Sequence, residues 1–219
     1  MFIGIENGYG IGKDLKNLKK FKDAGVTYIT LSHNGDNDIC DSASGHNEHK
    51  GLSEFGKEVI REMNRLGIMI DISHTSEKTS FDVLELSEKP IIASHSSAKS
   101  LCNHPRNLSD ELMRAIAQKG GVVQVCLYHG FIKKGGKATL KDAVDHIDYI
   151  VKTIGIDHVG IGSDFDGGGG LIGLQAVNEY PQLTMGLLRR GYSEEDIAKI
   201  WGENLLRVMS EIMRSDIEK

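Results

Sequence analysis

The sequence predicts an α/β fold of the (β/α) barrel type, and three observations support this. Short β-branched runs alternate with amphipathic stretches along the 219-residue chain, giving six strand–helix pairs. Repeated βα units imply parallel strands joined by helical crossovers. Nearly every predicted strand ends on a residue able to do chemistry, and a barrel gathers its strand tips around one axis, whereas an open sheet uses one switch point. A complete TIM-type barrel has eight βα units, so we expect an incomplete one.

The predicted strands are short runs rich in Val, Ile and other apolar residues, at 1–5, 26–32, 68–73, 90–94, 121–127 and 158–163. The predicted helices repeat apolar residues every three to four positions, at 13–24, 53–66, 76–87, 108–119 and 139–154, followed by a pair at 174–190 and 193–213. Ser or Thr precedes several of these helices, and Gly25, Gly67 and Gly120 stand where helices should stop. No linker or low-complexity segment divides the chain, so residues 1–219 are expected to form a single domain.

Composition excludes several classes of function. The chain carries 26 Lys and Arg against 31 Asp and Glu, interspersed, with a net charge of −5, so it lacks the basic face that binds nucleic acid. No apolar stretch reaches the roughly 20 residues of a membrane span.

The N-terminal residues show no signal-peptide pattern, which predicts a cytoplasmic location for the sequence as given. A targeting segment ahead of this sequence would not be detected. Cys40, Cys102 and Cys126 show no CxxC spacing, as expected of reduced thiols.

Three strand ends carry the donors of a metal site. Glu6, His74 and His95 each stand at the end of a predicted strand. Two neutral imidazoles and one carboxylate form a common catalytic zinc set that leaves coordination open for water, whose pKa zinc lowers to about 7. The pattern therefore predicts a hydrolase.

Two further residues suggest how a substrate would be handled. Asp164 lies in "GIGSDFDGG", where Gly160 and Gly162 share its strand face and are expected to leave space beneath the carboxylate. Asp164 is predicted to act as a general base; the alternative is that it caps the turn into "DGGGG". Arg106 in "HPRN" is predicted to pair with a substrate carboxylate, the alternative being an exposed surface charge.

Other histidines have weaker claims to a site. His46 and His49 have an HxxH spacing within the polar loop "SGHNEHKG", so both are expected to be solvated. His146 and Asp148 form a His-x-Asp pair in a predicted helix, where residues two apart point to different faces and cannot chelate one ion.

Six motifs, "GIENG", "LSHN", "DISH", "ASHSSA", "HPRN" and "GSDFDG", occur in this order along almost the whole chain. Together they resemble the membrane (renal) dipeptidase family of metallopeptidases, including its bacterial members. The resemblance implies a (β/α) TIM-type barrel of the amidohydrolase kind, two zinc ions bridged by a Glu, and hydrolysis of dipeptides that have a free C-terminal carboxylate.

The resemblance also implies a role for each strand-end residue. Glu6 would bridge the two zinc ions, and His74 and His95 would bind one of them. His33 would polarise the scissile carbonyl, Arg106 would bind the dipeptide carboxylate, and Asp164 would be the acid/base.

The sequence departs from the family pattern at one place. Family members begin with a strand carrying His-x-Asp, whose side chains hold the other zinc, whereas here Glu6 arrives before any such strand. We therefore expect an N-terminally truncated barrel, an incomplete second zinc site and impaired dipeptidase activity. Missing strands would expose strand edges, so self-association, such as a homodimer, is expected as well.

Two other functions stay open on the sequence alone. One is a mononuclear amidohydrolase that acts on another small amide or lactam. The other is a non-catalytic remnant that uses the metal or the pocket only for binding. Metal stoichiometry and a panel of dipeptides would separate these from a dipeptidase.

Overall fold

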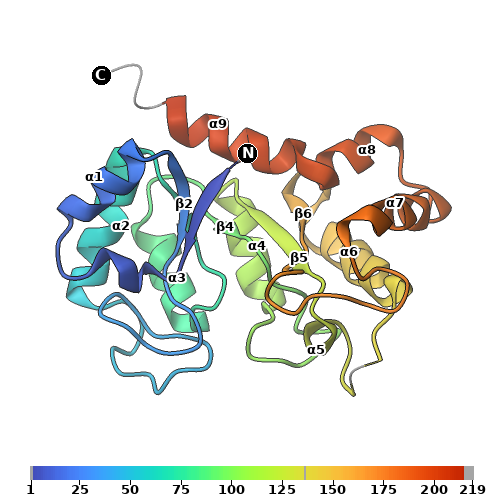
Figure 1. The fold of residues 1–219 in the computed structure, drawn as a ribbon, viewed down its shortest axis with the longest axis horizontal. Helices are drawn as coiled ribbons and strands as arrows, with labels where there is room; N and C mark the ends of the chain where they lie inside the picture. The colour runs from blue at the N-terminus through green and yellow to red at the C-terminus, as the bar shows by residue number, and fades with distance from the viewer. Residues whose placement is uncertain (1, 136, 215–219) are drawn as a thin grey trace. The chain divides into compact units, whose positions relative to one another are not determined.

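The structure, a computed structural model, describes residues 2–135 and 137–214 and divides into two compact units (Figure 1). The first unit comprises residues 1–93, 118–121 and 207–219, and the second comprises 94–117 and 122–206. Each unit is described by itself below. The single domain expected from the sequence therefore stays a prediction.

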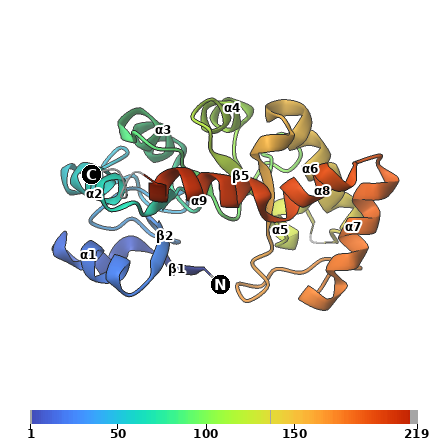
Figure 2. The ribbon, with the colours of Figure 1, turned by 90° about the horizontal axis from the view of Figure 1, so that it is seen from above.

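The first unit is built from four parallel strands in chain order, β1-β2-β3-β4. The strands are β1 (Ile3–Glu6), β2 (Val26–Thr30), β3 (Met69–Asp71) and β4 (Ile92–Ala93). A 3₁₀ turn η1 (Gly8–Ile11) follows β1, and the crossover helices are α1 (Lys16–Asp23), α2 (Glu54–Leu66) and α3 (Glu77–Leu86). Figure 2 shows these three helices side by side, with β1 and β2 next to α1.

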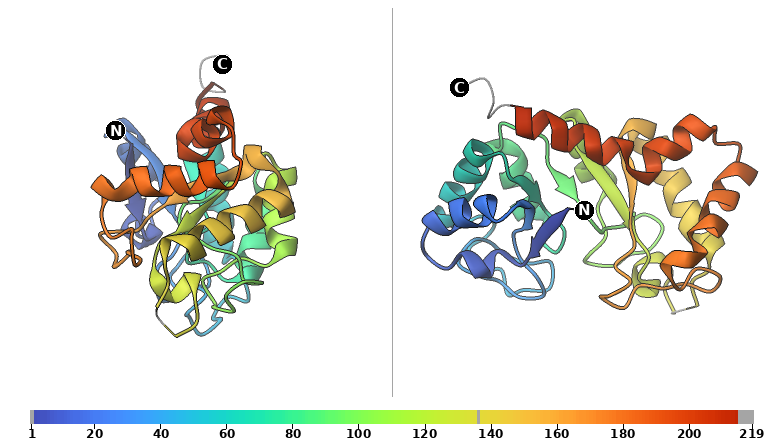
Figure 3. Two further views of the ribbon diagram at one scale, coloured as in Figure 1. Left: turned by 90° about the vertical axis from the view of Figure 1, so that its right-hand side faces the viewer. Right: turned by 45° about the horizontal axis from the view of Figure 1, so that its top comes forward.

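The second unit pairs two parallel strands, β5 (Val122–Cys126) and β6 (Val159–Gly162). Its helices before β6 are most of α4 (Asp110–Gln118), α5 (His129–Ile132), α6 (Leu140–Ile154) and the turn η2 (Ile156–His158). After β6 come η3 (Val177–Glu179), α7 (Tyr180–Arg189), α8 (Glu194–Ala198), the π-helical stretch η4 (Lys199–Glu203) and the start of α9 (Asn204–Arg214). Helix α7 contacts both α6 and α8, as can be followed in Figure 3.

All six strands and the helices that alternate with them lie where the sequence predicts them, with ends shifted by a few residues. The segment predicted as a helix at 193–213 is helical, but a π-helical stretch at 199–203 divides it into α8 and α9, and Gly202 in that stretch has a non-helical backbone. The short helix α5 was not predicted, because four residues are too few to show a helical period.

Capping residues explain several helix ends. The Ser53 side chain accepts the Gly56 N–H at 2.9 Å, and the Ser76 side chain accepts the Thr79 N–H at 3.1 Å. Gly67 closes α2 with a left-handed backbone (φ 63°), a conformation that costs glycine nothing.

Strand β1 differs from the others in its exposure. The middle strands are buried, as Ile29 and Ile70 illustrate, whereas Ile3 of β1 is 43% exposed and Phe2 just before it is 45% exposed. An exposed apolar strand can associate with another chain. Self-association of this protein stays a prediction.

In the part of the chain that the structure describes, no helix has both the length and the apolar character needed to cross a membrane.

Helix α6 gives His146 and Asp148 separate structural partners. His146 is 1% exposed, and its Nδ1 accepts the Ala98 N–H at 3.2 Å. Its Nε2 then donates to the Ile132 carbonyl at 3.0 Å, so the imidazole is neutral. Asp148 accepts a hydrogen bond from the Tyr192 hydroxyl at 2.9 Å on another face of the helix.

This arrangement predicts sensitivity to acid. Burial lowers the pKa of His146 below its ordinary value of 6.5, so below that pH the unfolded chain binds a proton that the folded chain does not. The free energy of unfolding should fall with decreasing pH, by at most about 1.4 kcal/mol per pH unit from this group. Urea unfolding at about pH 7.5 and about pH 5.5 should show a smaller loss for His146→Gln than for the parent chain. Equal losses would contradict the assignment.

Candidate functional site

Strand register aligns three residues at the carboxyl edge of the first unit. Glu6 pairs with Thr30, and Thr30 pairs with Asp71, so three parallel strands end in one row. His33 and His74 each follow their strand by three residues. The two histidines therefore leave adjacent strands at equivalent positions.

The row brings predicted site residues into contact. Nε2 of His74 lies 3.2 Å from Oε1 of Glu6. The imidazole rings of His33 and His74 have centroids 4.4 Å apart, with their planes tilted by 36°. The His74 side chain is 9% exposed and that of Glu6 is 47% exposed, so the pair is reachable from the Glu6 side.

A buried carboxylate that the sequence reading missed fixes the turn before His74. Asp71 is fully buried, and it accepts hydrogen bonds from the Thr30 hydroxyl at 2.6 Å and the Ser73 N–H at 3.0 Å. His74 itself has a left-handed backbone with φ 70°. Such a backbone is uncommon in residues other than glycine and is enriched at functional sites.

The second unit carries His95 and Arg106. His95 is buried, and its Nδ1 lies 2.7 Å from the Ser94 hydroxyl. When Nδ1 donates to that hydroxyl, Nε2 keeps its lone pair for a metal. Arg106 is only 4% exposed, so the alternative of an exposed surface charge is wrong.

The Arg106 guanidinium is held by the protein on several sides. It donates to the His95 carbonyl at 3.2 Å and to the Ser96 hydroxyl at 3.4 Å, and it lies 5.2 Å above the Phe131 ring centroid. These contacts orient the guanidinium. Its role toward a substrate carboxylate stays a prediction.

Asp164 forms the turn after β6, and the residue is half-buried. Its backbone is left-handed (φ 56°), and its carbonyl accepts the N–H groups of Gly167 at 3.1 Å and Gly169 at 2.6 Å. A Cβ at Gly167 would lie 2.1 Å from Asp164 Oδ1, so the Asp164 carboxylate packs closely against the backbone of Gly167. The main chain of Asp164 forms the turn, and the Cys126 thiol donates to its carboxylate at 4.0 Å. Its role as the acid/base stays a prediction.

The glycines of β6 do not leave open space, and that expectation is wrong. A Cβ at Gly162 would lie 1.7 Å from the Ser94 carbonyl oxygen, and one at Gly160 would lie 3.1 Å from Cγ of Gln124. The space is filled by the neighbouring backbone and side chain. Gly162 therefore lets the segment that carries His95 lie against β6.

The donor set suits a metal such as zinc. Among the described residues, Glu6, His74 and His95 each offer one ligand atom to a metal ion. An imidazole and a carboxylate that already lie 3.2 Å apart in the first unit fit the nitrogen and oxygen donors that zinc prefers. Burial raises the pKa of the Cys40 thiol to about 12, so that sulfur is protonated and is a poor ligand.

The two histidines of the polar loop, His46 and His49, differ in their exposure to solvent. His46 is exposed, as expected. His49 is half-buried, with Nε2 2.7 Å from the Asn37 carbonyl, so the expectation that it is solvated is wrong. The loop folds inward because Asp41 accepts the His49 N–H at 2.8 Å.

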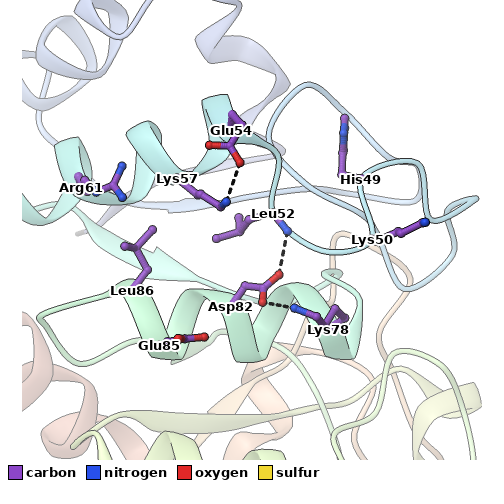
Figure 4. Close-up of a pocket in the computed structure, with 10 residues that line it drawn as sticks. All are labelled: His49, Lys50, Leu52, Glu54, Lys57, Arg61, Lys78, Asp82, Glu85 and Leu86. Carbon is purple, nitrogen blue, oxygen red and sulfur yellow. Dashed lines mark hydrogen bonds and ion pairs between the residues drawn. The ribbon is translucent and has the colours of Figure 1, made fainter.

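A separate cavity of about 660 Å³ lies between α2, α3 and the polar loop (Figure 4). It is lined by His49, Lys50, Leu52, Glu54, Lys57, Arg61, Lys78, Asp82, Glu85 and Leu86. Lys57 pairs with Glu54 at 2.6 Å, and Lys78 pairs with Asp82. Its charges largely compensate one another, and none of the predicted site residues lines it.

Comparison with known proteins identifies the family. A family model described as membrane dipeptidase (peptidase family M19) matches residues 1–217. The chain belongs to the membrane dipeptidase family. This confirms the resemblance read from the six motifs.

Individual relatives agree with this assignment. A dipeptidase of Schizosaccharomyces pombe is 44% identical over an alignment of 213 positions that covers 94% of this chain and 51% of that protein. The chain thus spans about half the length of this curated relative. The crystal structure of the probable dipeptidase PvdM from Pseudomonas aeruginosa has a TM-score of 0.94 and 34% identity, over 96% of this chain and 68% of that one.

A metallopeptidase from Rhodobacter sphaeroides, solved with a phosphinate mimic of the dipeptide L-Ala-D-Ala, has a TM-score of 0.91 and 29% identity. The match covers 96% of this chain and 63% of that one. Together with the parallel strands, these similarities confirm the predicted fold class, an α/β fold of the TIM-barrel type with six βα units.

The site geometry predicts which histidines matter for metal binding. We expect His74→Ala and His95→Ala each to abolish tight zinc binding, because each removes a buried imidazole donor. His46→Ala should leave binding intact, because that side chain is exposed in a loop. Elemental analysis after dialysis measures this, and equal zinc loss from all three variants would refute the assignment.

Proposed function

We propose that the chain is a zinc-dependent dipeptidase that hydrolyses the peptide bond of dipeptides. The observation that carries the proposal is the contact of His74 Nε2 with Glu6 Oε1 at 3.2 Å, beside the ring of His33. Membership of the membrane dipeptidase family supports it.

In this proposal Glu6, His74 and His95 hold the metal. Zinc, when bound, lowers the pKa of a coordinated water and polarises carbonyl groups. His33 donates a hydrogen bond to the scissile carbonyl oxygen, and the adjacent His74 ring limits its freedom. Preorganised donors of this kind stabilise the charge that develops on that oxygen.

Asp164 moves the proton in the proposed reaction. Its carboxylate takes a proton from the attacking water and returns it to the leaving amine. Arg106 binds the carboxylate at the substrate's C-terminus through a charge-assisted pair. The Rhodobacter sphaeroides relative, bound to a mimic of a dipeptide, supports small dipeptides as the substrate class.

The cysteines and the first strand bear on the cellular location and the self-association of the protein. We propose a cytoplasmic location, because Cys40, Cys102 and Cys126 are buried and none is in a disulfide, as in reducing compartments. Exposed Ile3 on β1 and Phe2 just before it support self-association.

One experiment separates this function from its alternatives. The zinc-loaded chain is assayed on free dipeptides, on dipeptides with an amidated C-terminus, and on small lactams, with bound metal measured in parallel. Cleavage of the free dipeptides alone supports the proposal. Cleavage of lactams or of amidated dipeptides at equal rates indicates another amidohydrolase, and metal binding without any turnover indicates a non-catalytic protein.

Arg106→Ala should chiefly raise KM for free dipeptides. A charged hydrogen bond contributes about 1.5 to 3 kcal/mol, which corresponds to roughly 10-fold or more in KM. Arg114→Ala is the matched control, because Arg114 is an exposed arginine of the same unit. Since Arg106 also contacts the His95 carbonyl, zinc content is measured alongside. An unchanged KM in a variant that keeps its zinc would remove the assigned role.

Asp164→Asn should chiefly lower kcat, by about 100-fold or more, because the amide cannot accept the proton. Asp166→Asn, two residues away and exposed, should keep the parent kcat. Steady-state kinetics on both variants decide the matter. Full kcat in Asp164→Asn would show that this carboxylate is not the acid/base.

A further inference from the structure

The loop between β2 and α2 reaches the backbones of both His33 and His74 in the first unit. The Ser42 hydroxyl lies 2.5 Å from the His33 carbonyl oxygen and 3.1 Å from the His74 carbonyl oxygen. The N–H of the next residue, Ala43, donates to the same His74 carbonyl at 2.7 Å. Ser42 is only 5% exposed, so water competes little for these bonds.

These contacts bear on the left-handed backbone of His74. A residue other than glycine is strained in that conformation, which persists only where the surroundings hold it. The His74 carbonyl receives the Ala43 N–H and faces the Ser42 hydroxyl. The loop therefore helps to fix the direction in which the His74 side chain leaves the main chain.

Two carboxylates fix the position of Ser42. Asp36 accepts the Ser42 N–H at 2.7 Å and the His46 N–H at 2.6 Å. Burial acts to raise the pKa of Asp36, but the backbone N–H groups around it outweigh this and hold the pKa below its usual value. A Cβ at Gly45 would lie 1.7 Å from Asp36 Oδ1, so the loop closes tightly around the carboxylate.

The second carboxylate, Asp41, ties the loop to the start of α3. It is fully buried and accepts the N–H groups of His49 at 2.8 Å and Gly51 at 2.7 Å. Its main-chain carbonyl accepts the Ser76 N–H at 2.9 Å and the Thr79 hydroxyl at 3.0 Å. Ser42 thus lies between a fixed loop and the segment that follows β3.

We propose that Ser42 is a positioning residue that links the backbones of His33 and His74 and so sets the spacing of their imidazoles. A hydroxyl donates one hydrogen bond at a time, so the proton goes to one carbonyl while the oxygen stays close to both. Ser42 lies 9 residues from His33 and 32 residues from His74 in the sequence, so its hydroxyl connects the segments that follow β2 and β3. Its consequence for zinc rests on the proposed function, since His74 is a metal ligand there.

The test compares Ser42→Ala with Ser44→Ala, an exposed serine of the same loop, and with Ser42→Thr, which keeps the hydroxyl. Zinc affinity is measured by competition with a chelator, and stability by urea unfolding of the metal-free chain. Loss of a group that orients a ligand typically weakens metal affinity by about 10- to 100-fold. We expect that loss in Ser42→Ala, parent affinity in Ser44→Ala, and partial recovery in Ser42→Thr. A lower stability of Ser42→Ala with unchanged zinc affinity would overturn the proposal.

A second readout does not need the metal. In the metal-free chain, the imidazole NMR resonances of His33 and His74 should both shift in Ser42→Ala, because the stacking of their rings changes. Ser44→Ala should leave both where they are. If the parent chain binds no zinc, the proposed function fails, whereas unshifted resonances in Ser42→Ala overturn only the role of Ser42.

Discussion

The register between parallel strands β1, β2 and β3 is the constraint on which the functional groups of the first unit depend. Glu6, Thr30 and Asp71 form one row at the strand ends, and the Thr30 hydroxyl donates to Asp71 across it. Because side chains alternate between the faces of a strand, a slip of one residue would turn the Glu6 carboxylate to the other face. Buried apolar pairs such as Ile29 and Ile70 resist that slip, so the core determines the position of the polar groups.

Much of this arrangement could be predicted from the sequence because it depends on local patterns. Apolar runs and caps locate the strands and helices, and the rule that parallel strands end at one edge brings Glu6 close to His74. The motifs add the family, which the comparisons confirm. The roles of His95 and Asp164 remain predictions.

The features that the sequence did not reveal depend on contacts between distant segments. A lone serine such as Ser42 carries no signal, because its partners lie 9 and 32 residues away. Gly162 suggested open space, but the backbone at Ser94 fills it, and no local pattern shows which segment approaches a glycine. The sequence left a surface charge open as the alternative for Arg106, because the carbonyl of His95 and the ring of Phe131 that surround it come from distant positions.

The loop built on Asp36 and Asp41 has a consequence for the order of folding. Its carboxylate hydrogen bonds close segments of only 6 to 12 residues, whereas the bond from Ser42 to His74 spans 32. Short closures lose less chain entropy and form faster than long ones. The loop can therefore acquire its shape early in folding, before β3 packs against it. The entropy cost of ordering these residues is then met during folding and does not weaken the binding of a ligand.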